Sequence, residues 1–309
     1  LSSDAGKTFK NIDGRNVHSD HHALWINPKR DSHMINGNDG GLNITYDNGV
    51  NWFKANSPAV GQYYAIAVDD AKPYNVYGGF QDNGTWFGPS NNRETTDWHD
   101  SGNYPYKSIG GGDGMQVQVD TRDNTTVYVG SQFGAYSRLN KNAPFAGRVS
   151  VRPQHELGDK PLRFNWQSPI LLSKHNQDVF YFGSNRFHRS FNKGENSVNL
   201  SGDLTGGKKE GNVPFGTLVT MSESPLRFGL IYTGSDDGYI YITKDGGTSW
   251  KNITPAGLAE CLINAIEVSP HDKATVYIAT TRYKFNDHTP GLYKSTDYGT
   301  TWTKINTGI

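Results

Sequence analysis

An eight-residue pattern recurs along the chain and constrains its fold more than any other feature. The pattern is Ser/Thr-x-Asp-x-Gly-x-Ser/Thr/Asn-Trp/Phe, and it occurs at residues 2–9, 45–52, 243–250 and 295–302, with a degenerate fifth copy at 190–194. Its Asp can accept hydrogen bonds from backbone N–H groups of its own turn, and its Gly takes the left-handed conformation that the turn needs. The aromatic residue starts the next strand and packs into the core. Each copy therefore predicts a strand, a tight turn and a second strand.

A second repeat consists of short β-rich runs that end in a small residue. These small residues are 42, 51, 53, 51 and 45 positions apart, and they are Gly37, Gly79, Gly130, Gly183, Gly234 and Ala279. Another apolar strand precedes each run, and a turn usually rich in Pro, Asp, Asn or Ser separates the two. A repeat of this length is typical of units with four strands. The sequence therefore predicts an all-β chain of four-stranded antiparallel units.

The eight-residue pattern resembles the Asp-box, or BNR repeat, of sialidases, two-propeller xyloglucanases and sortilin/Vps10 ectodomains. In that family the Asp-box marks a hairpin of a β-propeller blade, so the resemblance implies a β-propeller. Asp4, Asp47, Asp245 and Asp297 would then be structural residues of turns away from the active face. Residues 17–138 also resemble bacterial BNR-repeat proteins labelled glycosyl hydrolase or sortilin-like, in blocks such as Gly-Asn-Asp-Gly-Gly and Gln-Asp-Asn-Gly.

The repeats divide the chain into six full blades and one incomplete blade of a single propeller domain, residues 1–309. We expect half a blade at 1–12 and full blades at 13–56, 57–100, 101–150, 151–201, 202–253 and 254–309. The simplest closure is a seven-bladed ring with an incomplete first blade. A larger ring and one half of a two-propeller protein are the alternatives. Because the chain starts inside an Asp-box without a signal sequence, we expect it to be part of a longer protein.

Composition argues against several function classes. Lys plus Arg and Asp plus Glu both number 30, so the formal net charge is zero and no global field draws the chain to nucleic acid. The single cysteine, Cys261, excludes an internal disulfide framework and a cysteine-based zinc site. No apolar run approaches the length of a membrane span. We expect a secreted, periplasmic or cell-surface protein that requires no cofactor and whose partner is a glycan, a peptide or a protein.

Polar side chains recur in the loops that a propeller would place on one face. These loops join successive blades, or join the second and third strands of one blade, and they lie opposite the Asp-box turns. Polar groups that converge on a channel mouth are what a ligand site needs. Asp-Gly and Asn-Gly are also common hairpin turns, so turn chemistry is the alternative for each Asp. The residues expected to contact a ligand are His18, Asp20, His22, Asp82, Asp113, Asn185, Arg186, Arg282 and Tyr283.

His18, Asp20 and His22 form the densest polar cluster in the sequence. Alternate residues of a strand point to the same face, which would bring two imidazoles and a carboxylate together. Such a set suits a divalent metal, and Asp39 in the next loop could join it. A hydrogen-bonded loop lock or a substrate-contacting network is the alternative for the same residues.

Three functions stay open from the sequence. The first is a secreted or surface propeller that binds a carbohydrate or protein ligand on its channel face. The second is an inverting glycoside hydrolase, implied by the resemblance of residues 38–44 and 235–239 to acidic loops of xyloglucanase-like propellers. Asp39 would be the base and Asp236 or Asp237 the acid, with carboxyl groups roughly 6.5–9.5 Å apart. The third is a structural module of a large surface protein. A sialidase is disfavoured, because an Arg-Ile-Pro motif and an obvious arginine triad are lacking.

Overall fold

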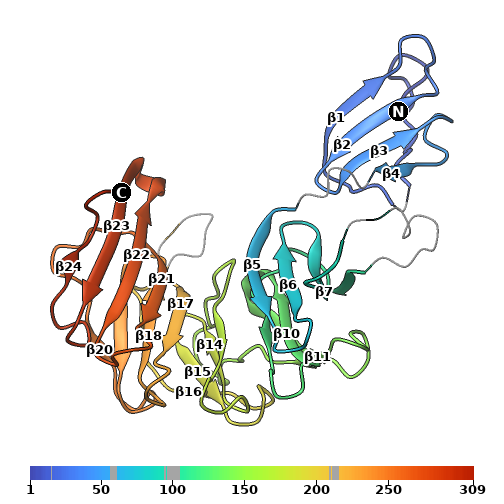
Figure 1. Ribbon diagram of the computed structural model, residues 1–309. Coiled ribbons are helices and arrows are strands. Elements are labelled where there is room, and N and C mark those ends of the chain that lie inside the picture. Colours follow the sequence, from blue (N-terminus) through green and yellow to red (C-terminus); the bar gives the residue numbers. More distant parts are fainter. Residues whose placement is uncertain (15, 56–60, 94, 96–104, 209, 211–215) are drawn as a thin grey trace. The chain divides into compact units, whose positions relative to one another are not determined.

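The computed structural model describes residues 1–309 except 15, 56–60, 94, 96–104, 209 and 211–215. The described residues form six four-stranded antiparallel sheets and two short 3-10 helices (Figure 1). In every sheet the four strands pair in sequence order, as a meander. The predicted all-β class and four-stranded repeat are therefore confirmed.

Residues 21–150 contain the first three sheets. The first sheet consists of β1 (His21–Ile26), β2 (Met34–Asn38), β3 (Gly41–Thr45) and β4 (Phe53–Ala55). The second consists of β5 (Tyr63–Val68), β6 (Asn75–Phe80), β7 (Gly84–Pro89) and β8 (Lys107–Gly110). The third consists of β9 (Gln118–Val119), β10 (Thr126–Ser131), β11 (Ala135–Asn140) and β12 (Val149–Ser150), with helix η1 (Gln132–Gly134) between β10 and β11.

Residues 170–304 contain the other three sheets. The fourth sheet consists of β13 (Ile170–Leu172), β14 (Phe180–Gly183), β15 (Phe187–Ser190) and β16 (Val198–Asn199). The fifth consists of β17 (Leu218–Glu223), β18 (Ile231–Ser235), β19 (Ile240–Thr243) and β20 (Lys251–Asn252). The sixth consists of β21 (Leu262–Val268), β22 (Val276–Arg282), β23 (Asp287–Ser295) and β24 (Thr303–Lys304), with helix η2 (Tyr283–Phe285) between β22 and β23.

One expected blade limit and the expected half blade differ from the sheets. The limits at 56/57 and 100/101 lie outside the described residues, but β8, which follows residue 100, pairs with β7 and so belongs to the second sheet. In residues 1–12, where half a blade was expected, the structure has no strand. Leu1 and Lys10 nevertheless exchange two backbone hydrogen bonds of 2.7 and 2.8 Å, so this segment folds back on itself around its Asp-box.

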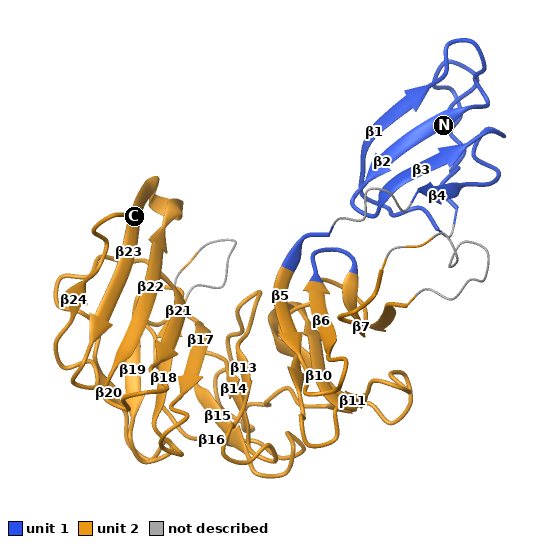
Figure 2. Ribbon diagram, in the orientation of Figure 1, with its two compact units in different colours: residues 1–63, 80–83 blue, residues 64–79, 84–309 orange. Residues whose placement is uncertain are grey.

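The chain divides into two compact units (Figure 2). Unit 1 comprises residues 1–63 and 80–83, and unit 2 comprises residues 64–79 and 84–309. Unit 1 thus holds the first sheet together with the turn between β6 and β7. The single domain expected from the sequence stays a prediction, and the two units are described separately below.

The core of unit 2 lies between successive sheets. Four buried clusters each combine side chains of two neighbouring sheets. They pair Tyr77 of β6 with Val127 of β10, Tyr128 of β10 with Phe180 of β14, Tyr181 of β14 with Ile231 of β18, and Ile240 of β19 with Ile278 of β22. Strands buried on both faces need an unbroken run of apolar residues, which explains the β-branched and aromatic second strands of the repeat.

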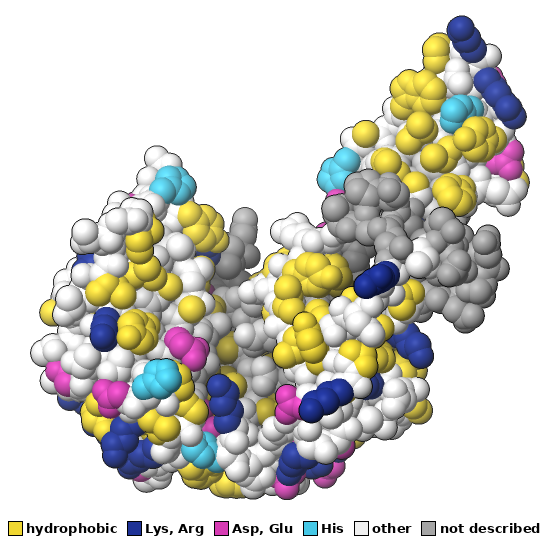
Figure 3. All heavy atoms as spheres, viewed as in Figure 1, with side chains coloured by type: hydrophobic (Ala, Val, Ile, Leu, Met, Phe, Trp, Pro, Cys, Tyr) yellow, Lys and Arg dark blue, Asp and Glu magenta, His cyan; other side chains and the backbone are white. Residues whose placement is uncertain are grey.

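Charged side chains of both signs share the surface of unit 2. On the face seen in Figure 3, Lys and Arg side chains lie among Asp and Glu side chains, and no extended patch of one sign is visible there. This mixture agrees with the zero net charge of the sequence. Within the described part of the chain, no helix has the length and the hydropathy needed to cross a bilayer.

Candidate functional site

The first, fourth, fifth and sixth sheets carry their predicted site loops at one end and an Asp-box at the other, whereas the second and third sheets have the loops but no Asp-box. In the first sheet His21, the start of β1, pairs with Asn38, the end of β2, so the turn after β2 and the segment before β1 lie at the same end. Thr45, the first Asp-box residue, pairs with Met34 at the opposite end. The fifth sheet repeats this arrangement. We call the first end the loop end and the second the Asp-box end.

The Asp-box carboxylates accept hydrogen bonds from groups of their own turns. Asp297 Oδ1 accepts hydrogen bonds from the Ser295 hydroxyl (2.8 Å) and from the Thr301 N–H (2.8 Å), and its Oδ2 accepts one from the Thr301 hydroxyl (2.6 Å). Such hydrogen bonds from the residue four positions later lower the pKa of Asp4, Asp245 and Asp297 to about 2. The hydrogen bonds of these carboxylates are thus made within their own turns, and the structural role of the acids stays a prediction.

The degenerate fifth Asp-box is the same turn with an amide in place of the carboxylate. The Ser190 hydroxyl donates to Asn192 Oδ1 (2.7 Å), and the N–H groups of Gly194 and Asn196 donate to Ser190 Oγ and Asn192 Oδ1. The burial of the aromatic residue at the end of the Asp-box differs more among the copies than the sequence indicates. Phe9 of the first copy is largely exposed, so the prediction that this residue packs into the core is wrong there.

The Asp-box tryptophans also donate hydrogen bonds to the preceding repeat, a contact that the repeat pattern does not predict. The indole N–H of Trp302 donates to the Ile253 carbonyl (2.8 Å), and that of Trp250 donates to the Leu200 carbonyl (2.9 Å). Trp52 makes the same bond to Ile12 in unit 1. The carbonyls lie 40–50 residues earlier in the chain. The one sequence signal for these contacts is the tryptophan at the last position of three Asp-boxes.

Asp39 lies at the loop end of the first sheet and pairs with a histidine. His22 Nε2 is 2.6 Å from Asp39 Oδ1. The Asp39 side chain is 33% exposed and the His22 side chain 68% exposed, so a solute can reach both. The Asp39 backbone is held from two sides, because its N–H donates to the Asp20 carbonyl (3.2 Å) and its carbonyl accepts from Asn83 Nδ2 (3.0 Å).

Two further carboxylates surround Asp39 in unit 1. One carboxylate oxygen each of Asp20, Asp39 and Asp82 lies within 4.8 Å of the others. His18 contacts this group on both sides, with Nδ1 3.4 Å from Asp20 Oδ2 and Nε2 3.2 Å from the Asp82 carbonyl oxygen. We call these residues, with His22, the Asp39 cluster. Three carboxylates this close repel one another, which favours hydrogen-bond donors or a cation between them.

The predicted set of His18, Asp20 and His22 is arranged differently from the strand alternation expected of it. β1 starts at His21, so His18 and Asp20 precede the strand. The structure instead places Asp39 and Asp82 beside Asp20. The sequence missed this grouping because Asp82 belongs to another repeat.

Asp236 and Asp237 lie in unit 2, at the loop end of the fifth sheet, and both are buried. Asp236 Oδ1 accepts from the N–H groups of Gly216 (2.9 Å) and Thr217 (3.0 Å), and its Oδ2 accepts from the Thr217 hydroxyl (3.0 Å) and from Asn165 Nδ2 (3.4 Å). Burial raises the pKa of Asp236, against the opposing effect of the Thr217 hydrogen bonds. Asp237 accepts from the Ser235 hydroxyl (2.6 Å) and from the Gly206 N–H (2.9 Å).

Asp236 lies two positions after Gly234, the small residue of its repeat, and side chains at the same place in other repeats also accept hydrogen bonds from a backbone segment. In three successive sheets this side chain accepts a hydrogen bond from the backbone of the segment before the first strand. The residues are Gln132 (from the Asp113 N–H, 3.4 Å), Asn185 (from the Arg163 N–H, 3.0 Å) and Asp236 (from Gly216 and Thr217). Asp39 occupies this position in the first sheet, but its carboxylate bonds to an exposed imidazole instead.

The other predicted ligand contacts are in unit 2 and are spread over several sheets. Asp113 is buried before β9. Arg186 Nη1 lies 3.7 Å from Asp159 Oδ2, and Arg282 Nη1 lies 3.2 Å from Asp287 Oδ2. Tyr283 is exposed in η2. These residues and Asn185 share the loop ends of their sheets, but they do not form one cluster.

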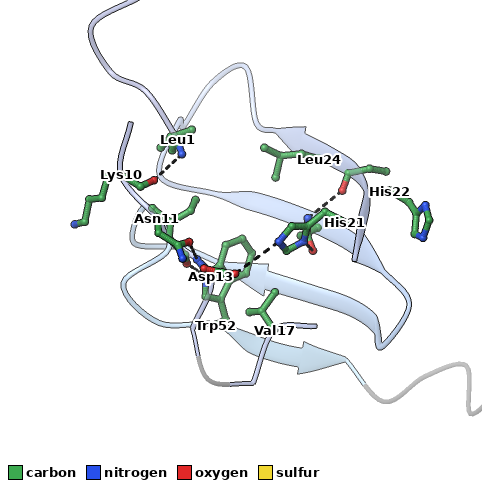
Figure 4. A pocket seen from close by; sticks show the side chains of 12 residues that line it. Leu1, Lys10, Asn11, Asp13, Val17, His21, His22, Leu24 and Trp52 are labelled. Atoms are coloured by element: carbon green, nitrogen blue, oxygen red, sulfur yellow. Dashed lines mark hydrogen bonds and ion pairs between the residues drawn. The ribbon is translucent and has the colours of Figure 1, made fainter. Parts of the chain in front are cut away.

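A pocket of about 440 Å³ lies in unit 1 between residues 10–13 and β1 (Figure 4). In Figure 4 His21 points toward Asp13, with 3.9 Å between Nε2 and Oδ2, and His22 is turned away from them. Of the predicted site residues, His22 alone lines this pocket. The pocket therefore does not bring the predicted site together.

Repeated four-stranded meanders with Asp-box turns define a β-propeller-like repeat protein. The chain is similar in structure to the GH74 enzyme of Niastella koreensis, with a TM-score of 0.54 and 15% identity over 92% of this chain and 47% of that one. It is also similar to the GH74 xyloglucanase of Xanthomonas campestris, with a TM-score of 0.55 and 11% identity over 93% of this chain and 47% of that one. The chain thus spans about half the length of these enzymes, and at such identities the likeness shows the fold alone. No family model matches the sequence, and no curated protein matches it significantly.

Proposed function

We propose that this chain is a carbohydrate-binding β-propeller and that the Asp39 cluster contacts the glycan. The observation that carries the proposal is the exposed Asp39–His22 pair at a position where other sheets use a polar side chain to hold a loop. A carboxylate with accessible oxygens can accept hydrogen bonds from two neighbouring sugar hydroxyls, and an imidazole can donate or accept another. The likeness to GH74 enzymes supports a polysaccharide over other ligands.

The proposal extends to the whole protein. A seven-bladed ring, completed by sequence outside these 309 residues, would bring the loop ends of all sheets to one channel mouth. A protein that binds polysaccharides would act in the periplasm, at the cell surface or after secretion. The coverage of about half of each GH74 chain supports the presence of further domains.

Asp39→Ala is expected to weaken glycan binding about 10- to 100-fold, because hydrogen bonds to a charged group contribute about 1.5–3 kcal/mol each. The measurement is affinity electrophoresis of the full chain against soluble polysaccharides, followed by calorimetry on those that bind. Asp31→Ala is the matched control, since Asp31 is an exposed acid in the turn at the other end of the same sheet. Equal glycan affinity of the wild type and Asp39→Ala would show that the Asp39 cluster does not contact the glycan.

An inverting glycoside hydrolase is the second candidate, with Asp39 as base and Asp236 or Asp237 as acid. The likeness to GH74 enzymes favours it, and the raised pKa of Asp236 suits a general acid. The donors around Asp236 disfavour it, because they hold the carboxylate against its own loop. Release of reducing sugar by the wild type but not by Asp39→Ala would establish hydrolysis. Binding to a peptide array without glycan binding would instead support a protein ligand or an assembly role.

We also propose that the Asp39 cluster can bind a divalent cation. Carboxylate oxygens are the ligands that Ca²⁺ prefers, and a cation would offset the repulsion among Asp20, Asp39 and Asp82. Millimolar Ca²⁺ is expected to raise the melting temperature of the wild type by about 2–4 °C and to leave Asp39→Asn unchanged. An unchanged wild type in the presence of Ca²⁺ or Mn²⁺, with no metal by elemental analysis, would contradict the cation site.

A further inference from the structure

Phe133 has a backbone conformation that aromatic residues rarely adopt. Its φ is 56° and its ψ is 38°, in the left-handed region, which costs on the order of 1–2 kcal/mol. Of the eight described non-glycine residues with positive φ, four occupy the same place in an Asp-box. Three others are Asn or Asp, which tolerate this region. Phe133 is the remaining one, and the equivalent position of the preceding repeat holds Asp82, with φ 59°.

Tertiary contacts maintain this strained turn. The Phe133 N–H donates to the Trp166 carbonyl (3.3 Å). A Cβ on the next residue, Gly134, would lie 2.7 Å from Cδ1 of the buried Phe164, so the turn is packed closely on the core. Strain that packing maintains at an exposed side chain is a signal of function, because a polar turn residue would fold there at lower cost.

Phe133 and Trp166 form an exposed aromatic pair. Their rings are edge to face, with centroids 5.3 Å apart and an interplanar angle of 84°. Phe133 is 42% exposed and Trp166 39% exposed. The indole N–H of Trp166 donates to the Tyr64 hydroxyl (3.2 Å), and Tyr64, in β5, packs against a buried core cluster. Side chains of β5, of η1 and of the segment before β13 thus contact one another, and we call them the aromatic platform.

We propose that the aromatic platform, Phe133 and Trp166 supported by Tyr64, binds a sugar ring of a neutral polysaccharide by stacking. The C–H groups on one face of a pyranose are apolar and weakly positive, and they match the negative face of an aromatic ring. The platform itself carries no charge. Arg163, the cation that precedes Trp166, is paired with Asp203 at 2.6 Å. A neutral sugar therefore fits better than an anionic one.

This inference rests on the proposed function and adds to it a contact region in unit 2. The Asp39 cluster belongs to unit 1, so the two regions can be removed separately. The Asp39 cluster would form hydrogen bonds with the polysaccharide, and the second region would stack on it.

Phe133→Asn is the sharpest test, because it separates binding from folding. Asn accepts the left-handed conformation, so this variant should unfold at the same temperature as the wild type or higher. Its affinity for xyloglucan and for hydroxyethyl cellulose should nevertheless fall at least about tenfold, as should that of Trp166→Ala. Binding of the full chain is measured by affinity electrophoresis and calorimetry, with polygalacturonate as the anionic comparison.

Phe145→Ala is the matched control, since Phe145 is 80% exposed and contacts only Arg148 among the described ring and cation partners. This variant should bind as the wild type does. If the wild type binds and both platform variants keep its affinity within about twofold, the aromatic platform is wrong and the proposed function stands. If the wild type binds none of the polysaccharides, both are wrong. If Asp39→Ala keeps its polysaccharide affinity and Phe133→Asn loses it, the result supports the aromatic platform and contradicts the Asp39 cluster as a glycan contact.

Discussion

Replacement of Lys141 by methionine is expected to destabilise unit 2 by about 3–5 kcal/mol. Lys141 Nζ lies 3.0 Å from Asp69 Oδ2 and 2.7 Å from the Tyr77 hydroxyl oxygen, and all three side chains are buried. Methionine preserves most of the volume of the lysine side chain. It leaves the Asp69 carboxylate buried without its cation, which is the costly change.

The same variant should unfold in acid at a higher pH than the wild type. Burial alone would raise the pKa of Asp69, but hydrogen bonds from Asn75, Lys141 and Tyr77 outweigh it and lower the pKa to about 2. This folded-state pKa lies below the unfolded-state pKa of about 3.9. Asp69 therefore stabilises the fold at every pH above about 3.9. That stabilisation is lost as the pH falls through the folded pKa. Without Lys141 the folded pKa rises and the stabilisation by Asp69 becomes smaller, so the less stable variant unfolds at a higher pH.

Urea unfolding near pH 7 and acid titration below about pH 5 measure the two effects. The double variant Asp69→Asn/Lys141→Met removes both charges and should regain a large part of the lost stability, since no unpaired buried charge remains. A Lys141→Met protein within about 0.5 kcal/mol of the wild type would show that the pair does not stabilise the fold.

Asp236→Ala is expected to cost about 2–4 kcal/mol, because it leaves the buried N–H groups of Gly216 and Thr217 without an acceptor. It also removes the partner of the Thr217 hydroxyl. Asp39→Ala, at the same position of the first repeat, should change stability by less than about 0.5 kcal/mol, since its carboxylate is accessible and bonds to an exposed histidine. The two substitutions thus distinguish an acid that holds a loop from the acid that we propose contacts a ligand.

Amide hydrogen exchange checks this pair of substitutions directly. In Asp236→Ala the amides of Gly216 and Thr217 should lose protection, while the first sheet exchanges as in the wild type. Asp39→Ala should leave exchange at Gly216 and Thr217 unchanged. Equal protection of these two amides in Asp236→Ala and the wild type would mean that Asp236 does not hold the loop. That result would favour the proposal that Asp236 acts as a general acid.

Local residue patterns alone determined the repeat. Asp297 and its equivalents bond to residues within four positions, and the glycine of each Asp-box meets a steric need of the same turn. The alternation of turns and β-rich runs predicted four strands per unit, and the structure has them. Interactions of this kind are complete within one repeat, so a single sequence is enough to read them.

Tertiary structure decided what the individual acids and aromatics do. Asp39 and Asp236 have the same place in the repeat, yet one bonds to an exposed histidine and the other is enclosed by Gly216 and Thr217. Tyr64 and Trp166 meet across 102 residues, and Asp69 and Lys141 meet across 72. Burial and partners of this kind depend on which repeats pack against each other. The repeat pattern therefore indicated where the loops lie, and only the packed chain showed which of their side chains are exposed and which are buried.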